Sequence, residues 1–224
     1  TIKDTLGPTR IPVLSEEGRE MLYDERRNWE LFLLVDPLDG TVEFIKGNNE
    51  FTVNIALLAD NECVGSVLYV PYLEKMYVAA KGKGAYLIRN IAPSDNPQYE
   101  GKQIEAMLEK LPLEGSCHEG FRVALSRSHQ TPETHLRVNE LRAKHPDLEV
   151  IEQGSSYKFC LLAEGVVDYY VRTTNTYEWD TAAGELILSE AGGKTLSYPD
   201  GKPLAYNKED LKNPWFEAQG ARCK

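Results

Sequence analysis

The residues with the clearest chemical potential are two aspartates three positions apart, in the segment Asp36-Pro37-Leu38-Asp39-Gly40-Thr41. The proline fixes a backbone angle and the turn frees the carbonyl of Leu38, so two carboxylates and one carbonyl can converge. Such hard oxygen ligands suit Mg²⁺. If Thr41 opens a helix, the amides of Gly40 and Thr41 face outward as an anion site. The segment therefore predicts a cation site beside a phosphate site or, on these residues alone, a plain surface turn.

Two further acidic motifs could complete such a site. Glu16 and Glu17 are adjacent and follow an apolar segment, and on their own they are as consistent with a solvated pair. Asp180 follows Trp179 directly before a helical pattern that begins Thr181-Ala182-Ala183-Gly184, where the simplest role of an aspartate is to cap the helix. A capping carboxylate is also rigidly held, which is what a metal ligand requires.

Two polar segments of the second half could bind the rest of a ligand. Gly154-Ser155-Ser156 lies between a predicted strand and a predicted helix, so its amides can cradle a second phosphate or a sugar, with Lys158 adding a point charge. The alternative is an ordinary turn with a solvated lysine. Ser126-Arg127-Ser128-His129 follows another predicted strand and is either a polar loop or part of the same ligand site.

The elements that must position these residues divide at about residue 120. In the first half, residues 31–35 form an apolar run typical of a buried strand, and a short helix is expected over 41–45. Residues 91–120 are predicted to be a variable insertion with a short helix over 102–111. Four segments rich in Val, Ile, Tyr and Leu predict an antiparallel meander: 51–58, 64–70, 75–80 and 85–88.

Strands and helices alternate in the second half. Strands are expected over 122–125, 148–152 and 168–172, and helices over 132–144, 156–164 and 181–191. This alternation favours an α/β layer. We therefore predict two parts: a β-rich half over 1–120 that holds the catalytic motifs, and an α/β half over 121–224 that supplies ligand-binding residues and the last metal ligand.

Composition excludes several classes of protein. The chain has 224 residues, and 35 acidic against 25 basic side chains give a net charge of −10, which disfavours binding to a nucleic-acid polymer. No apolar run reaches the roughly 20 residues that cross a bilayer, so no transmembrane segment is expected. The four cysteines are far apart in the sequence, which favours a reduced, cytoplasmic compartment.

The ordered motifs resemble the Mg²⁺-dependent phosphatase superfamily of inositol monophosphatase and fructose-1,6-bisphosphatase. The motifs that carry this likeness are Glu16-Glu17, the 36–41 segment, the 179–184 segment and Glu190-Ala191-Gly192-Gly193. Within the superfamily the chain is most similar to the CysQ-type 3′(2′),5′-bisphosphate nucleotidases, on the segments 12–17, 43–46, 50–57, 126–129 and 154–160. The resemblance implies an α/β fold, the layered αβαβα sandwich of sugar phosphatases.

The resemblance also implies a role for each position. Glu16, Asp36, Asp39, Asp180 and the carbonyl of Leu38 would hold two or three Mg²⁺, with Glu17 behind them. Gly40 and Thr41 would bind the scissile phosphate, and the Thr41 hydroxyl would position the attacking water. Ser126, His129, Gly154, Ser155 and Lys158 would contact the nucleotide, with Arg172 at its non-scissile end.

The implied reaction is hydrolysis of the 3′-phosphate of adenosine 3′,5′-bisphosphate, or of its 5′-phosphosulfate analogue, to AMP and phosphate. An inositol or sugar monophosphatase is the alternative within the superfamily.

The family's activating Asp, in a Thr-x-Ala-Asp-like segment, has no counterpart before Ser15, since Asp4 has other surroundings. We therefore expect a sandwich without its first elements, with exposed apolar surface, and keep a non-catalytic binding remnant as a third hypothesis. The partner would be a small bisphosphate nucleotide; a homodimer and peripheral contact with the inner membrane stay open.

Overall fold

The computed structural model describes residues 9–92, 101–116 and 118–221 of the chain. The elements follow one another in this order: β1 (Val13–Ser15), α2 (Tyr23–Arg26), β2 (Leu31–Asp39), α3 (Thr41–Lys46), β3 (Thr52–Ala59), β4 (Glu62–Val70), the 3₁₀ turn η2 (Pro71–Leu73), β5 (Lys75–Ala80), β6 (Gly84–Ile88), α4 (Gly101–Glu105), β7 (Glu109–Lys110), β8 (Phe121–Ser126), α5 (Pro132–Lys144), β9 (Leu148–Gln153), α6 (Tyr157–Glu164), β10 (Tyr169–Arg172), α7 (Glu178–Glu190), β11 (Lys194–Ser197) and β12 (Phe216–Gln219).

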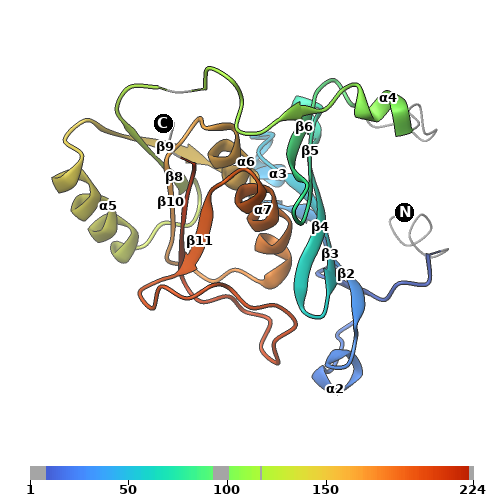
Figure 1. Ribbon diagram of the computed structural model, residues 1–224. Coiled ribbons are helices and arrows are strands. Elements are labelled where there is room, and N and C mark those ends of the chain that lie inside the picture. Colours follow the sequence, from blue (N-terminus) through green and yellow to red (C-terminus); the bar gives the residue numbers. More distant parts are fainter. Residues whose placement is uncertain (1–8, 93–100, 117, 222–224) are drawn as a thin grey trace.

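Two sheets and the helices between them form the layers of the fold (Figure 1). The first sheet has the order β1 to β7, with β1 parallel to β2 and the later pairs antiparallel. The second has the order β11-β12-β10-β8-β9, in which β8 runs parallel to β9 and β10. Helices α6 and α7 lie between the sheets and α5 covers the outer face of the second, whereas no described helix lies along the outer face of the first (Figure 1).

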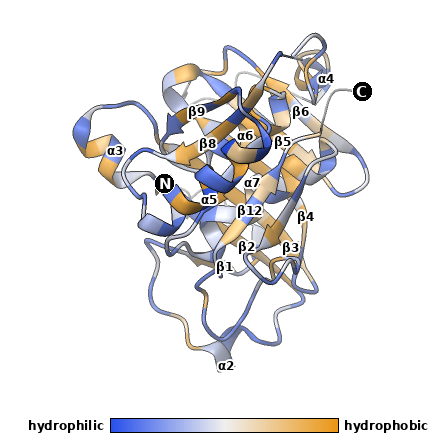
Figure 2. Ribbon diagram, turned by 90° about the vertical axis from the view of Figure 1, so that its left-hand side faces the viewer, coloured by the Kyte–Doolittle hydropathy of each residue, from blue (hydrophilic) through white to orange (hydrophobic). Residues whose placement is uncertain are grey.

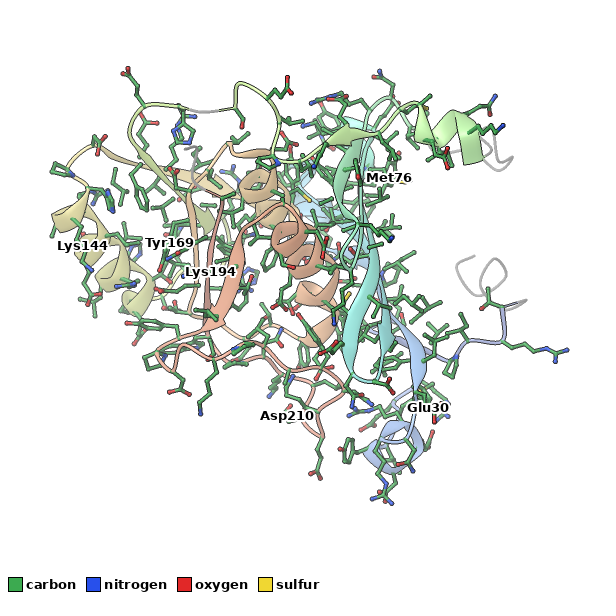
Figure 3. The ribbon with its side chains drawn as sticks, in the orientation of Figure 1. Glu30, Met76, Lys144, Tyr169, Lys194 and Asp210 are labelled. Atoms are coloured by element: carbon green, nitrogen blue, oxygen red, sulfur yellow. The ribbon has the colours of Figure 1, made fainter. Side chains whose placement is uncertain are left out.

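The core lies between the two sheets, and the sequence pattern explains why. Every residue of α6 is buried, because both sides of this helix face other elements. Strand β3 alternates buried and half-buried residues, as expected for a strand with one face on the core. Apolar residues gather on the central strands and helices, and side chains fill the space between the sheets (Figures 2 and 3).

Helices α6 and α7 pack so closely that one position must lack a side chain. A β-carbon at Gly184 of α7 would lie 2.6 to 2.7 Å from side-chain atoms of Phe159 on α6. Such contacts are too short to persist, so either the ring or a helix would have to shift. The glycine therefore sets the spacing between the two central helices.

Replacing Gly184 by Ala is expected to lower the free energy of unfolding by about 1–2 kcal/mol. Overpacking a core costs about 1–3 kcal/mol, which exceeds the gain of about 1 kcal/mol in helix propensity. Urea unfolding would measure the change. Gly101→Ala on α4 is the matched control, because nothing lies within 4 Å of its β-carbon position. Equal stability of the Gly184 variant and the wild type would contradict this account of the packing.

Most elements predicted from the sequence are confirmed, with three corrections. Strand β2 runs on to Asp39 with a register shift between Asp36 and Asp39, where a turn was expected. The helix expected over 102–111 is α4 followed by the short strand β7, and α7 begins at Glu178, three residues early. Strands β11 and β12 were not predicted. The α/β fold class is confirmed, while the division at residue 120 stays a prediction.

A membrane-spanning helix was not expected, and among the described helices none is long and apolar enough to cross a bilayer. Cys63 and Cys160 form no disulfide, and Cys160 is buried in the core as its apolar helix face suggests. Asp4, Cys117 and Cys223 lie outside the described residues.

Candidate metal and phosphate site

Three carboxylates from separate segments of the chain lie close together. Glu16 follows β1, Asp36 is on β2 and Asp180 is in the first turn of α7, and one oxygen of each lies within 4.8 Å of the others. Glu16 is exposed, Asp180 is half-buried and Asp36 is only 1% exposed. The sequence placed all three in one cation site, and the structure brings them together.

Local structure orients the two buried members of this group. The Leu38 amide donates a 2.9 Å hydrogen bond to Oδ1 of Asp36, which fixes the carboxylate across the Pro37 position. Asp180 is not the N-cap of α7: it stands three residues after the N-cap Tyr177, and its Oδ2 accepts the Tyr177 amide at 2.7 Å. That bond satisfies one orphan amide of the helix and leaves the other oxygen for a ligand.

The electrostatics of the cluster favour a cation. Burial, reinforced by Asp39 and Glu16, raises the pKa of Asp36 to about 10. Burial, again with Asp39 nearby, raises the pKa of Asp180 to about 7. Partial burial also raises the pKa of the Glu16 carboxyl, because it removes hydrating water. In each case lost hydration is the largest cause, and neighbouring negative charges raise the pKa further.

The residues fit a divalent cation. Oδ2 of Asp36 is buried and has no hydrogen-bond donor within the described structure, which is costly for a carboxylate unless a ligand occupies that side. The donor set consists of carboxylate oxygens and the adjacent Leu38 carbonyl, the ligands that Mg²⁺ prefers. Glu16, Asp36 and Asp180 therefore form a candidate metal site.

Asp39 and Glu17 lie differently from these three. Oδ2 of Asp39 accepts hydrogen bonds from Thr52, Asn54 and Ser156, so this oxygen is held by the protein itself. Asp39 nonetheless lines the same cavity as the cluster. Glu17 is exposed, and its carboxylate is not part of the group of three. Their metal-binding and supporting roles stay predictions.

The expected phosphate loop lies beside the cluster. Gly40 has φ +89°, a left-handed conformation that favours glycine, and is the N-cap of α3. A β-carbon there would lie 3.0 Å from the Glu50 carbonyl and 3.2 Å from Cβ of Ser155. The Thr41 hydroxyl donates to the Leu38 carbonyl at 3.1 Å, which directs its lone pairs away from that carbonyl. Gly40 and Thr41 both line the cavity.

The hydrogen bonds of the turn at 154–156 differ from those expected from the sequence. Its amides were expected to be free for a ligand, but the Gly154 amide donates to Oε2 of Glu50 at 2.8 Å. The Ser156 amide donates to Asp39 at 2.5 Å. Ser155 has φ +52° and lines the cavity. The turn therefore touches the metal side of the site directly.

Lys158 is buried below this turn, at 2% exposure, rather than solvated. Its Nζ donates to the carbonyls of Gln153 and Ser155, at 3.0 and 2.5 Å. Burial, reinforced by the nearby Arg172 guanidinium, lowers the pKa of Lys158 to about 7. Nε of Arg172 is buried without a hydrogen-bond partner among the described residues. Both side chains line the cavity.

Ser126 and His129 border the same cavity. Ser126 is buried at the end of β8, and its Oγ accepts the His129 amide at 3.2 Å, which shapes the loop after the strand. Partial burial of the His129 imidazole, with the Arg172 guanidinium nearby, lowers its pKa. The shift favours the neutral imidazole, which can act as a hydrogen-bond donor or acceptor.

A single cavity of about 280 Å³ is lined by the three clustered carboxylates, Asp39, the 40–41 loop, the 154–156 turn and Ser126, His129, Lys158 and Arg172. Its lining includes the carboxylates of Glu16, Asp36 and Asp180 as well as the nitrogen groups of His129, Lys158 and Arg172. The cavity is close in size to the lower range of small-ligand sites, about 300 Å³. A ligand with more than one anionic group fits this lining, provided that a cation binds the carboxylates.

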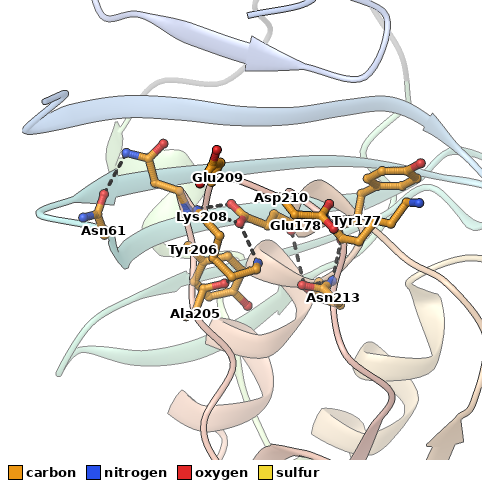
Figure 4. A network of polar contacts seen from close by, with 12 residues as sticks. Asn61, Tyr177, Glu178, Ala205, Tyr206, Lys208, Glu209, Asp210 and Asn213 are labelled. Atoms are coloured by element: carbon orange, nitrogen blue, oxygen red, sulfur yellow. Dashed lines mark hydrogen bonds and ion pairs between the residues drawn. The ribbon is translucent and has the colours of Figure 1, made fainter. Parts of the chain in front are cut away.

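A long loop between β11 and β12 holds the start of α7 in place (Figure 4). Glu178, fully buried, accepts the amides of Asn207 and Lys208 and the Lys208 ammonium, which lies 2.6 Å away. The Asn213 side chain donates to the Tyr177 carbonyl and to the Thr181 hydroxyl. These contacts fix the helix end from which Asp180 projects.

Several lining or supporting residues were not assigned from the sequence. Thr52 and Asn54 stand at buried positions of β3 where Ala56 and Leu58 follow with the same period of two. Polar residues in a buried, alternating set are a signal of a site that sequence reasoning could have used. Glu50 and Ser156 gave no comparable signal, because their partners come from distant segments.

Comparison with known proteins extends this description. The family model of the inositol monophosphatase family matches residues 2–218. The 3′(2′),5′-bisphosphate nucleotidase CysQ of Salmonella typhimurium is 41% identical over 213 residues, 95% of this chain and 76% of the relative. CysQ of Escherichia coli O6:H1 is 40% identical over the same shares. The crystal structure of CysQ from Bacteroides thetaiotaomicron, described as a bacterial member of the inositol monophosphatase family, has TM-score 0.91 and 45% identity, covering 99% of this chain and 81% of that one.

Fold and site together define a layered α/β protein of the inositol monophosphatase type, which structures at lower identity also share. Inositol monophosphatase II from Staphylococcus aureus has TM-score 0.70 at 20% identity, a likeness of fold alone. The chain belongs to the inositol monophosphatase family. The resemblance inferred from the ordered motifs is confirmed, whereas the homodimer and the cytoplasmic location stay predictions.

Proposed function

We propose that the chain is a Mg²⁺-dependent 3′(2′),5′-bisphosphate nucleotidase that removes the 3′-phosphate of adenosine 3′,5′-bisphosphate and leaves AMP. The observation that carries this proposal is the single cavity lined both by carboxylates and by His129, Lys158 and Arg172, which we assign to an acidic end and a basic end. A monophosphate would occupy one end only, whereas a bisphosphate uses both. The CysQ relatives are 3′(2′),5′-bisphosphate nucleotidases, which supports the same substrate class.

The acidic end is the place for the scissile phosphate. Glu16, Asp36, Asp180 and the Leu38 carbonyl would hold the Mg²⁺, with Asp39 as a further ligand. Bound there, the metal would supply charge neutralisation for the phosphate and a lower pKa for a coordinated water. Gly40 and Thr41 would donate their amides to the phosphate oxygens and so hold the phosphorus in line for attack.

Thr41 would orient the attacking water. Its hydroxyl hydrogen is committed to the Leu38 carbonyl, so its oxygen is left as an acceptor. A water that donates to this oxygen has a lone pair directed elsewhere, toward the phosphorus of a phosphate held at Gly40. The contribution of Thr41 is thus orientation rather than proton removal.

The opposite end would bind the 5′-phosphate. Arg172 is a charged donor and Lys158 becomes one when an anion binds beside it, and both line the cavity, where attraction to an anion is stronger than at the surface. Ser126, His129, Gly154 and Ser155 would border the ribose and base. A neutral inositol ring would leave the buried Nε of Arg172 without a partner, which disfavours that substrate.

A substrate panel tests the proposal. Phosphate release would be measured with Mg²⁺ from adenosine 3′,5′-bisphosphate, its 5′-phosphosulfate analogue and inositol monophosphate, each also after chelation by EDTA. We expect the highest kcat/KM for the bisphosphate nucleotide and no release after chelation. A higher kcat/KM for inositol monophosphate would replace the nucleotidase assignment, and the absence of release from all three would favour a non-catalytic binding protein.

Binding of AMP at pH 8 is expected to take up a proton at Lys158. The pKa of this amine is about 7 in the unliganded chain, and a phosphate beside it would raise that pKa, so the group changes from neutral to charged on binding. The affinity should then fall about tenfold per pH unit above 7. Calorimetry in two buffers of different ionisation enthalpy measures the uptake. Lys158→Met removes the titrating amine, so equal uptake by this variant would contradict the prediction.

A further inference from the structure

One oxygen at the edge of the candidate metal site receives an unusual number of protein hydrogen bonds. Oδ2 of Asp39 accepts from the Thr52 hydroxyl at 3.2 Å and from the Asn54 amide at 3.3 Å. It also accepts from the backbone amide of Ser156 at 2.5 Å and from the Ser156 hydroxyl. Two of its four donors therefore belong to one residue of the 154–156 turn.

The Ser156 hydroxyl reaches a second residue of the acidic cluster. Its Oγ lies 2.6 Å from the backbone carbonyl of Asp180, and it accepts a hydrogen from Asn54 at 3.1 Å. A hydroxyl has one hydrogen, which it can give to Asp39 or to Asp180 but not fully to both. The hydrogen bonding of one acidic residue therefore depends on that of the other.

A purely local role for Ser156 does not explain these contacts. Ser156 is the N-cap of α6, yet its side chain makes no capping hydrogen bond to that helix. Ser156 is 5% exposed, and the hydrogen bonds of its hydroxyl are to residues of β2, β3 and α7. Stabilising α6 is therefore not its function.

The same residue is attached to the substrate side of the cavity. Ser156 follows Ser155 directly, and a β-carbon at Gly40 would lie 3.2 Å from Cβ of Ser155. The Ser155 carbonyl is in turn held by Lys158 at 2.5 Å. A ligand that moves Ser155 or Lys158 therefore moves the residue that hydrogen-bonds Asp39 and Asp180.

We propose that Ser156 is a positioning residue that couples nucleotide binding at the basic end of the cavity to cation binding at the acidic end. The proposal rests on the proposed function, because it assumes that Mg²⁺ and a nucleotide occupy this cavity. It adds that the coupling passes through the hydroxyl of Ser156 and not only through direct contact between cation and phosphate.

Calorimetry with Mg²⁺ and AMP separates these two routes. AMP lacks the 3′-phosphate, so in the proposed pose no phosphate of AMP touches the cation site. The affinity of AMP would be measured without Mg²⁺ and at saturating Mg²⁺, and the affinity of Mg²⁺ without AMP. We expect each ligand to tighten the other at least about fivefold in the wild type, and Ser156→Ala to bring this factor close to one.

Two further variants make the result specific. Thr52→Val removes one donor from Asp39 without touching the turn, and we expect Mg²⁺ binding about tenfold weaker with an unchanged coupling factor. Ser66→Ala is the matched control, because Ser66 is also a buried serine and its hydroxyl has no partner among the described residues. Ser156→Thr keeps the hydroxyl and should retain the coupling.

The outcomes distinguish the two proposals. If Ser156→Ala keeps the wild-type coupling factor, the role of Ser156 is refuted while the proposed function stands. If the wild type binds Mg²⁺ neither in the absence nor in the presence of AMP, the proposed function itself is refuted. If Ser156→Ala does not fold, as judged by thermal unfolding, Asn54→Leu replaces it, because it removes the amide that holds both Ser156 and Asp39.

Discussion

Replacing Asp36 by Asn is expected to reduce phosphate release from adenosine 3′,5′-bisphosphate by more than about 100-fold. Changes to residues that only support a metal ligand already cost about 10- to 100-fold. Asp36 lies at the centre of the carboxylate cluster, with a buried oxygen that no described donor satisfies. The amide has the same shape but no charge for a divalent cation. Steady-state kinetics at saturating Mg²⁺ would measure the loss.

The stability of the metal-free protein should change in the opposite direction. Burial raises the pKa of Asp36 to about 10, so its ionised form is unfavourable in the folded chain, and an uncharged side chain relieves this. The melting temperature of Asp36→Asn without metal should therefore equal or exceed that of the wild type. Asp24→Asn, at an exposed aspartate that pairs with Arg27, is the control and should alter neither quantity. Undiminished hydrolysis by Asp36→Asn would refute the assigned role.

Replacing Gly154 by Ala should have the second largest effect, by displacing the 154–156 turn. The new β-carbon would lie 2.7 Å from the Glu50 carbonyl and 2.6 Å from Cγ of Glu43. A backbone oxygen cannot yield as a flexible side chain can, so the turn must move away from α3. Misplacement of catalytic groups by about 1 Å can cost about 100-fold in rate. We expect a loss of this order in kcat/KM.

The Gly154 effect has a structural signature of its own. The turn is held by the 2.8 Å bond from its amide to Glu50, whose carboxylate is also paired with Arg127. Displacement breaks that arrangement, so the free energy of unfolding should fall by about 1–3 kcal/mol. Gly65→Ala on β4 is the control, since its β-carbon would make only ordinary contacts of 3.8 Å or more. Wild-type kinetics for Gly154→Ala would show that the turn does not position the ligand.

The sequence predicted those elements whose pattern is local. The run at 31–35 and the meander that follows have the composition of buried strands, and they are β2 to β6 in the structure. Strands β11 and β12 escaped prediction because each has only four residues, and the pairing of β12 with β10 and of β11 with β12 depends on contacts between distant segments. The helix start at Glu178 was missed because a buried glutamate there is satisfied by a loop some 30 residues later.

The candidate site was predictable in its residue types and less so in its connections. The convergence of Glu16, Asp36 and Asp180 follows from the ordered motifs. The burial of Lys158, by contrast, reverses the usual surface preference of lysine and results from the position of α6 between two sheets. The hydrogen bonds of Ser156 join β2, β3 and α7, and no sequence interval reveals such a meeting.

The loop that holds Glu178 has a consequence for the protein's fluctuations. Asn207 and Lys208 belong to no strand or helix, yet their amides donate to a fully buried carboxylate. Opening the loop would remove the hydrogen-bond donors of the buried Glu178 carboxylate. The loop and the start of α7 must therefore open together as one cooperative unit. Asp180 belongs to that unit. A ligand bound at Asp180 would therefore suppress opening, and slow amide hydrogen exchange, in a loop that it does not touch.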